Sequence, residues 1–135
     1  MSYLLDQIKE HEGFRDKVYK CTQGYDKIVY GFAIKDLVLD EDIAEQILIK
    51  KLYDLQCKIQ DKFKWFDDLP QEAQDVITNM CYQLGVTGFS KFKKTIKLLK
   101  AHKFKAASIE MLDSKWALQT PNRAQELSLI LRNLN

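Results

Sequence analysis

A carboxylate and a thiol near the start of the chain are the side chains best suited to chemistry. Glu12 is followed nine positions later by Cys21. A carboxyl group can deliver a proton as a general acid, and a thiolate can act as an anion or a nucleophile. A free cysteine has a pKa of about 8.5, so a lysine within about 5 Å is needed to favour its anion, and Lys20 and Lys27 are the candidates. Cys21 can equally be a small half-buried hairpin residue, and Lys27 a residue on the sheet surface.

Two aspartates close in sequence could supply a second carboxylate beside Glu12. These are Asp16 and Asp26. Because side chains alternate between the faces of a strand, Asp26 and Lys27 should point in opposite directions. Surface charge is the more frequent role for aspartates of this kind.

The elements that must position these groups follow from the pattern of apolar residues. Apolar residues recur at helical spacing over 2–11, which predicts a helix that carries Glu12 at its C-terminal end and stops at Gly13. Residues 17–34 are rich in β-branched and aromatic side chains with two glycines, which predicts a small antiparallel sheet.

The rest of the chain has helical periodicity. Asp40 can N-cap a long helix that runs to about Lys64. Further helices are predicted from Pro70 to Gly85, over 92–99, over 104–112, and after the Thr120-Pro121 pair, in which Thr120 is the expected N-cap.

These elements predict an α+β fold in one domain, residues 1–135. It comprises a lobe with the sheet at about 12–38, a connecting helix at about 40–64, and a helical lobe at about 68–135 that includes helix 2–11. A chain of 135 residues is long enough for one core but too short for two independent domains. A cleft between two unequal lobes suits an extended polymer.

Composition narrows the class of protein. We expect synthesis in the cytoplasm without a signal peptide and no insertion into a membrane, because the first residues are charged and no apolar run is long enough to span a bilayer. Three widely spaced cysteines and two histidines without a CxxC pair predict reduced thiols, no metal and no cofactor.

Charge is distributed unevenly along the chain. Residues 1–75 hold 11 Lys and Arg against 16 Asp and Glu, whereas residues 76–135 hold 10 against 3. Seven lysines occur between Asp75 and Glu110 without an acid among them. Such a run attracts polyanions, namely nucleic acid, an anionic membrane or the cell wall, or it simply forms a solvated helix face. The phenylalanines nearby have the spacing of core residues, so we expect no nucleic-acid binding.

Five segments, in the same order, resemble the phage-type lysozymes, a family of muramidases. They are Glu12-Gly13-Phe14-Arg15 with Tyr19-Lys20-Cys21-Thr22-Gln23-Gly24-Tyr25; Ile28-Val29-Tyr30-Gly31-Phe32, in the place of a Thr-Ile-Gly-x-Gly-His pattern; Asp42-Ile43-Ala44-Glu45; Asn79-Met80-Cys81-Tyr82-Gln83-Leu84-Gly85; and Trp116-Ala117-Leu118-Gln119-Thr120-Pro121-Asn122-Arg123-Ala124.

The resemblance implies a lysozyme fold and a site that cleaves peptidoglycan between N-acetylmuramic acid and N-acetylglucosamine. Glu12 matches the general acid, which must keep its proton near neutral pH and so needs a partly apolar setting. Arg123 matches an arginine that pairs with and orients this glutamate, and Tyr82 and Gln83 match residues that contact sugar. The implied partner is the glycan strand of the wall, bound by a monomer.

Three positions depart from the family pattern. Cys21 replaces an aspartate, and Lys27 replaces a threonine. Phe32 replaces a histidine, at a position that we assign to substrate binding. In the family the aspartate and the threonine hold the water that attacks the anomeric carbon. Three alternatives follow: a hydrolase with an altered site, a lytic transglycosylase in which the substrate's own C6 hydroxyl attacks and Glu12 acts alone, and a non-catalytic protein that binds glycan or a partner protein.

Overall fold

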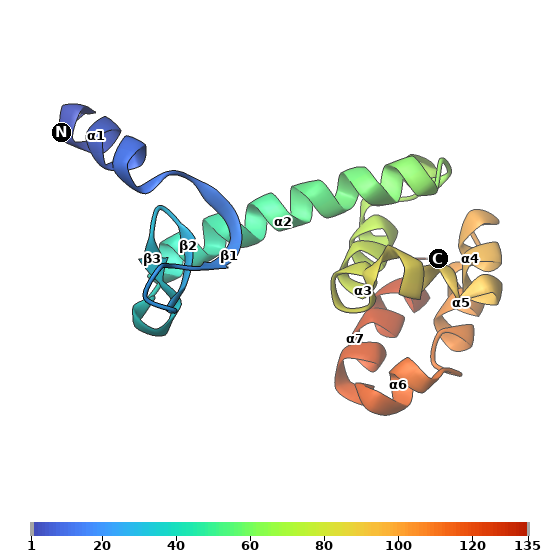
Figure 1. The fold of residues 1–135 in the computed structure, drawn as a ribbon. Helices are drawn as coiled ribbons and strands as arrows, with labels where there is room; N and C mark the ends of the chain where they lie inside the picture. Colours follow the sequence, from blue (N-terminus) through green and yellow to red (C-terminus); the bar gives the residue numbers. More distant parts are fainter. Residues whose placement is uncertain (1, 135) are drawn as a thin grey trace. The chain divides into compact units, whose positions relative to one another are not determined.

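The computed structural model describes residues 2–134 and divides into two compact units, residues 1–45 and 46–135 (Figure 1). Met1 and Asn135, the ends of the predicted domain, lie outside the described residues. Within residues 2–134 there are seven α-helices and one three-stranded antiparallel sheet, which confirms the α+β class. The predicted grouping of helix 2–11 with the helical lobe stays a prediction.

The first unit begins with helix α1 (Ser2–Glu12), which ends where the sequence indicated. Gly13 has φ 69°, and its N–H donates to the carbonyl of Lys9 at 2.9 Å. A glycine in this left-handed conformation is a common helix C-terminus, because other residues adopt it at a cost. Glu12 is therefore fixed as the last residue of α1.

The sheet follows directly. Its strands are β1 (Arg15–Lys20), β2 (Asp26–Val29) and β3 (Phe32–Ala33), in that order. Lys20 pairs with Asp26 and Tyr19 with Lys27, with an irregularity in β1 between Arg15 and Tyr19. The sheet thus begins two residues earlier than the predicted span 17–34.

The turn between β2 and β3 has two residues with positive φ. Gly31 has φ 73° and Val29 has φ 65°. A β-branched residue at positive φ is strained, and Val29 stands where the family pattern has its first glycine. Val29, the last residue of β2, therefore enters this turn in a conformation that is costly for a β-branched side chain.

A short 3₁₀ helix, η1 (Ile34–Asp36), leads to α2 (Glu41–Lys62). Helix α2 lies within the predicted range 40–64, and the carbonyl of Asp40 accepts the N–H of Ala44 at 2.9 Å. Asp40 therefore occupies the predicted N-cap position.

The second unit is helical throughout. After η2 (Phe66–Asp68) come α3 (Gln71–Ser90), α4 (Lys93–Lys100), α5 (Phe104–Glu110), α6 (Lys115–Gln119) and α7 (Pro121–Arg132). None of the helices in residues 2–134 combines the length and the apolar character that crossing a bilayer requires.

Two details of these helices differ from the sequence prediction. The end predicted at Gly85 is a break, with φ 79° and ψ 159°, and helical turns resume to Ser90. Thr120 occupies the predicted N-cap position of α7, but its hydroxyl donates to the carbonyl of Trp116 at 3.0 Å instead of capping α7. The reason is that α6, which the sequence pattern did not show, ends at this point.

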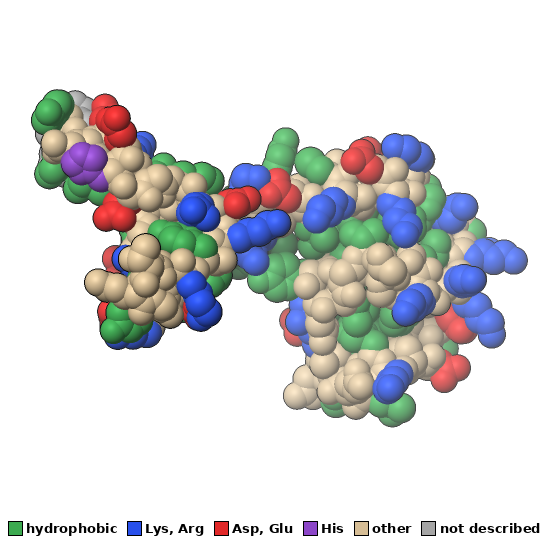
Figure 2. Space-filling view, viewed as in Figure 1, with side chains coloured by type: hydrophobic (Ala, Val, Ile, Leu, Met, Phe, Trp, Pro, Cys, Tyr) green, Lys and Arg blue, Asp and Glu red, His purple; other side chains and the backbone are tan. Residues whose placement is uncertain are grey.

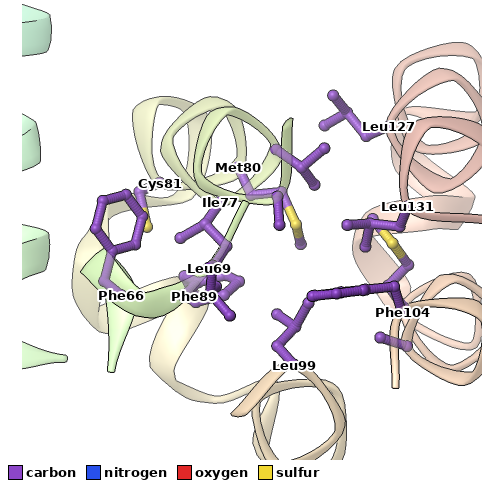
Figure 3. Packing of buried hydrophobic residues seen from close by; sticks show 14 of the residues in the cluster. Phe66, Leu69, Ile77, Met80, Cys81, Phe89, Leu99, Phe104, Leu127 and Leu131 are labelled. Atoms are coloured by element: carbon purple, nitrogen blue, oxygen red, sulfur yellow. The ribbon is translucent and has the colours of Figure 1, made fainter. Parts of the chain in front are cut away.

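A single hydrophobic core fills the second unit. Its members come from the end of α2, from η2 and from α3 to α7, and Figure 3 shows Phe66, Met80 and Leu131 among them. Phe89 and Phe104 are also buried, which confirms their prediction as core residues. Among residues 2–134, every buried hydrophobic side chain belongs to this second unit.

Candidate functional site

The carboxylate of Glu12 lies against the backbone of Gly31. A Cβ placed on Gly31 would lie 2.5 Å from Oε2 and 3.0 Å from Cδ of Glu12. The side chain of Glu12 is exposed, so this unit does not give it the partly apolar setting that the resemblance implied for a general acid. The end of α1 therefore places the proposed proton donor over the β2–β3 turn, at a spot that is open because residue 31 has no side chain.

Two aromatic rings join the segment after Glu12 to the same turn. The rings of Phe14 and Tyr30 have centroids 5.6 Å apart at 52°, and the ammonium of Lys9 lies 6.0 Å from the Tyr30 ring. Tilted aromatic pairs at this separation are attractive. Tyr30 was expected only as a sheet residue and Phe14 had no expected role, because their spacing carries no signal that the two rings would meet.

The thiol of Cys21 lies on a tight turn between β1 and β2. The N–H of Cys21 donates to the carbonyl of Tyr25, and the N–H of Gly24 donates to the carbonyl of Cys21, both at 2.9 Å. Backbone hydrogen bonds from Gln23 and Tyr25 lower the pKa of the Cys21 thiol, with a smaller contribution from the charge of Lys27, and partial burial opposes them. The backbone of this turn therefore favours the thiolate of Cys21.

The two lysines considered as partners of Cys21 have different positions. Lys20 pairs with Asp26 across the hairpin at 2.8 Å, Nζ to Oδ1, and this carboxylate raises the pKa of Lys20. Lys27 is paired with Tyr19 on the neighbouring strand, so its side chain lies on the face of the sheet away from Lys20 and Asp26. Of the two lysines, Lys27 is the one whose charge lowers the pKa of Cys21, whereas Lys20 pairs with the carboxylate of Asp26.

Phe32 lies on the face of the sheet opposite to Lys27. It pairs with Ile28, whereas Lys27 pairs with Ala33, and neighbouring residues on a strand point to opposite faces. The ring of Phe32 is 44% exposed, so it is available for contact.

In the second unit, Tyr82 and Gln83 lie on α3 just before the break at Gly85. Tyr82 is 48% exposed. The indole N–H of Trp116, a residue of α6 that is buried, donates to Oε1 of Gln83 at 2.9 Å. This bond orients the amide of Gln83 and leaves its NH₂ group as a donor.

Arg123 makes two hydrogen bonds to a residue of α3. Its Nε donates to Oδ1 of Asn79 at 2.8 Å, and a terminal nitrogen donates to the carbonyl of Asn79 at 3.1 Å. Two bonds to one residue fix the plane of the guanidinium. Asn79 lies in one of the segments that resemble the family, but no sequence pattern identified it as the partner of Arg123.

The proposed site residues therefore form two groups. Glu12, Cys21, Lys27 and Phe32 belong to residues 1–45, and Tyr82, Gln83 and Arg123 belong to residues 46–135. In the described part of the chain no three His, Cys, Asp or Glu side chains gather closely enough to hold a metal ion.

Comparison with known proteins identifies the family. The family model described as phage lysozyme matches residues 9–132. Two proteins of Dictyostelium discoideum, named probable T4-type lysozyme 2 and probable T4-type lysozyme 1, are each 26% identical to this chain; the alignments cover 94% and 97% of it and 92% and 94% of the relatives.

A phage protein is similar over part of its length. The pre-baseplate central spike protein Gp5 of Enterobacteria phage T4 is 26% identical over 95% of this chain, which corresponds to 27% of the spike protein. The family model covers nearly the whole chain, and the fold has the small sheet and the helical second unit that the resemblance implied. The chain belongs to the phage lysozyme family.

Proposed function

We propose that this chain is a peptidoglycan-cleaving glycosidase that hydrolyses the β-1,4 bond between N-acetylmuramic acid and N-acetylglucosamine, with Glu12 as the general acid. Membership of the phage lysozyme family gives the general class, a lysozyme-like glycosidase. The assignment of the acid rests on one observation: the Glu12 carboxylate lies at the end of α1 against the bare backbone of Gly31. In this role the chain is a bacteriolytic, endolysin-type wall enzyme.

The proposed reaction begins with proton transfer. Glu12 donates its proton to the glycosidic oxygen, the bond from that oxygen to C1 breaks, and positive charge develops on the sugar ring. Water then attacks C1 and gives up a proton. We assign Cys21, as its thiolate, to the place of the family's aspartate, where it accepts that proton and stabilises the charge on the ring.

The turn around Cys21 supports this assignment. Hydrogen bonds from the backbone of Gln23 and Tyr25, with the charge of Lys27, favour the anionic form of the thiol. A neutral thiol would stabilise the developing positive charge poorly, so the assignment of Cys21 requires a lowered pKa.

A lytic transglycosylase is the second candidate. Both residues that hold the water in the family are replaced, by Cys21 and Lys27. If the C6 hydroxyl of the muramic acid attacks C1, Glu12 alone can act first as acid and then as base, and the product is a 1,6-anhydro sugar.

The first test is cleavage of purified peptidoglycan with products identified by mass spectrometry. Glu12→Gln keeps the size of the side chain but cannot donate the proton, so we expect turnover to fall by roughly 10²-fold or more. New reducing ends indicate hydrolysis, and 1,6-anhydro ends indicate transglycosylation. No soluble fragments from the native protein, or equal release by Glu12→Gln, would reject the proposal in favour of a non-catalytic glycan-binding protein.

The second test addresses Cys21. We expect Cys21→Ala to lower turnover by about 10²-fold, and Cys21→Asp, which restores a carboxylate, to recover much of it. Alkylation by iodoacetamide checks the thiolate independently, since a lowered pKa makes Cys21 reactive at lower pH than an ordinary thiol. Unchanged hydrolysis in Cys21→Ala would remove Cys21 from the mechanism and leave Glu12 in place.

A further inference from the structure

Seven exposed lysines on and beside α4 form a surface that the proposed reaction does not use. We name it the lysine face; its members are Lys91, Lys93, Lys94, Lys97, Lys100, Lys103 and Lys105. Figure 2 shows blue side chains along the edge of the second unit that carries α4 and α5 in Figure 1.

The lysines face outward because the other side of α4 is needed for packing. Thr95 and Leu99 are buried on the inner side of the helix. Lys93, Lys97 and Lys100 follow one another at spacings of four and three residues, so they share a stripe with about 5–6 Å between neighbouring Cβ atoms. The stripe holds three positive charges along two turns of helix.

None of these lysines forms an ion pair with an acid among residues 2–134. In the described residues, the two ion pairs are Lys20 with Asp26 and Lys50 with Asp54. A shallow pocket of about 410 Å³ along the stripe is lined by Lys93, Ile96, Lys97, Lys100 and Ala101, without a carboxylate. Like charges at this spacing repel one another, and a bound polyanion would remove that repulsion.

Two acids, Glu110 and Asp113, line a pocket together with residues at the start of α4. This larger pocket, of about 560 Å³, is also lined by Lys93, Lys94 and other residues, and it lies beyond the N-terminal end of the stripe. Lys97 and Lys100 do not line that pocket, so the stripe stays cationic along most of its length.

The surroundings of the stripe distinguish between classes of polyanion. Single-stranded nucleic acid is bound on exposed aromatic rings, but Phe89 and Phe104 are buried in the core. Phe92 is half-buried and packs between the rings of Phe89 and Trp116. A membrane-surface helix needs an exposed apolar face, but the apolar side of α4, including Leu99, packs inside the protein. Of the polyanions considered, a water-soluble anionic chain bound by the lysine charges alone fits this surface.

We propose that the lysine face binds a flexible phosphodiester polymer of the bacterial surface. Lysine ammonium groups are compact point charges on mobile stems, so they suit phosphates whose positions vary along a flexible chain. The choice of a bacterial-surface polymer rests on the proposed function, which has the enzyme work at the wall. Binding there would hold the enzyme near its substrate between cleavages.

The test measures binding of poly(glycerol phosphate) to the full-length chain at several salt concentrations. The variant Lys93→Gln/Lys97→Gln/Lys100→Gln removes the stripe, and glutamine keeps a similar helix propensity. The matched control is Lys51→Gln/Lys58→Gln/Lys62→Gln, which removes three exposed lysines from one side of α2 and changes the net charge from +2 to −1 in the same way.

We expect the stripe variant to bind about tenfold more weakly or worse, with a salt slope reduced by roughly 2, since three phosphate contacts are lost. The control should change affinity much less. Equal losses in both variants would overturn the proposal, because net charge alone would then explain binding. Tighter binding to poly(dT), or to phosphatidylcholine vesicles containing phosphatidylglycerol, would overturn the assigned partner.

This measurement does not depend on catalysis. If the polymer binds as expected while the native protein cleaves no peptidoglycan, the proposed function fails and the lysine face remains as a binding surface. If peptidoglycan is cleaved but the stripe variant binds the polymer normally, the lysine face fails alone.

Discussion

At the scale of single residues, the position of the proposed acid depends on the lack of a side chain at Gly31. The carboxylate of Glu12 occupies space that any side chain at position 31 would fill. The contact involves the far end of a flexible side chain, so an added methyl group would displace the carboxylate more readily than it would disrupt the fold. The effect of such a change should therefore appear in turnover before it appears in stability.

Gly31→Ala tests this argument. Its Cβ would lie 2.5 Å from the present position of Oε2, so we expect turnover on peptidoglycan to fall by about 10 to 100-fold, because a displacement of about 1 Å at a reacting group has that scale of effect. The positive φ of 73° adds a backbone cost of about 1–2 kcal/mol, to be measured by denaturant unfolding.

Gly85→Ala is the control, because Gly85 has φ 79° at the break in α3, belongs to the second unit, and would carry an added Cβ that meets nothing within 4 Å. It should lose similar stability and much less turnover. Equal losses of turnover in the two variants would show that backbone strain, and not the position of Glu12, limits the reaction.

At the scale of elements, α3 connects the helices of the second unit through polar bonds and through the core. Asn79 holds Arg123 of α7, and Gln83 holds Trp116 of α6. Cys81 lies between them on the buried side of the same helix. A single helix thus carries Gln83 and orients Arg123, while its opposite side packs into the core.

The buried thiol of Cys81 should lower the stability of this unit as the pH rises into the alkaline range. Burial raises its pKa to about 12 from an ordinary value of 9.0. Between these values the unfolded chain releases the proton while the folded chain keeps it, so the folded state binds more protons and stability falls as pH rises. Below about 9 both states are protonated, and the group has no effect.

We expect the free energy of unfolding to fall more steeply between about pH 9 and 11 in the native protein than in Cys81→Ala. Alanine has no proton to lose, although the smaller side chain lowers stability at every pH. Denaturant titrations at several pH values measure both slopes. Parallel curves for the two proteins would contradict the assigned burial of this thiol.

The sequence was a good guide to elements with local signals. The stop at Gly13, the strands rich in β-branched residues and the start of α7 at Pro121 were predicted because the responsible residues act within a few positions. Helix α6 was missed because five residues carry no periodicity; it depends on Ser114, whose hydroxyl accepts the N–H of Ala117, and on burial of Trp116.

The candidate site was predicted less completely than the fold. The residue types at Glu12 and Cys21 were visible, but their surroundings depend on distant segments. The contact of Glu12 with Gly31 joins residues 19 positions apart, and the N–H groups that favour the Cys21 thiolate belong to the backbone, which every sequence has. Side-chain identity alone gives no information on either.

At the scale of the whole molecule, charge separates the two units. Residues 1–45 hold 6 Lys and Arg against 10 Asp and Glu, whereas residues 46–135 hold 15 against 9. The proposed catalytic acid thus belongs to the acidic unit and the lysine face to the basic one. An anionic wall should attract the second unit and repel the first.

Ionic strength should therefore act differently on two kinds of wall. On walls that carry anionic polymers, raising salt from about 50 to 200 mM should slow the release of fragments severalfold, because screening weakens the attraction of the lysine face. On walls from which these polymers have been extracted, the rate should stay level or rise, since only the repulsion of the acidic unit is left to screen. The stripe variant should behave on both walls as the native protein does on extracted walls. Equal salt dependence of the native protein on the two walls would show that the lysine face does not contribute to wall cleavage, because the glycan substrate is the same in both.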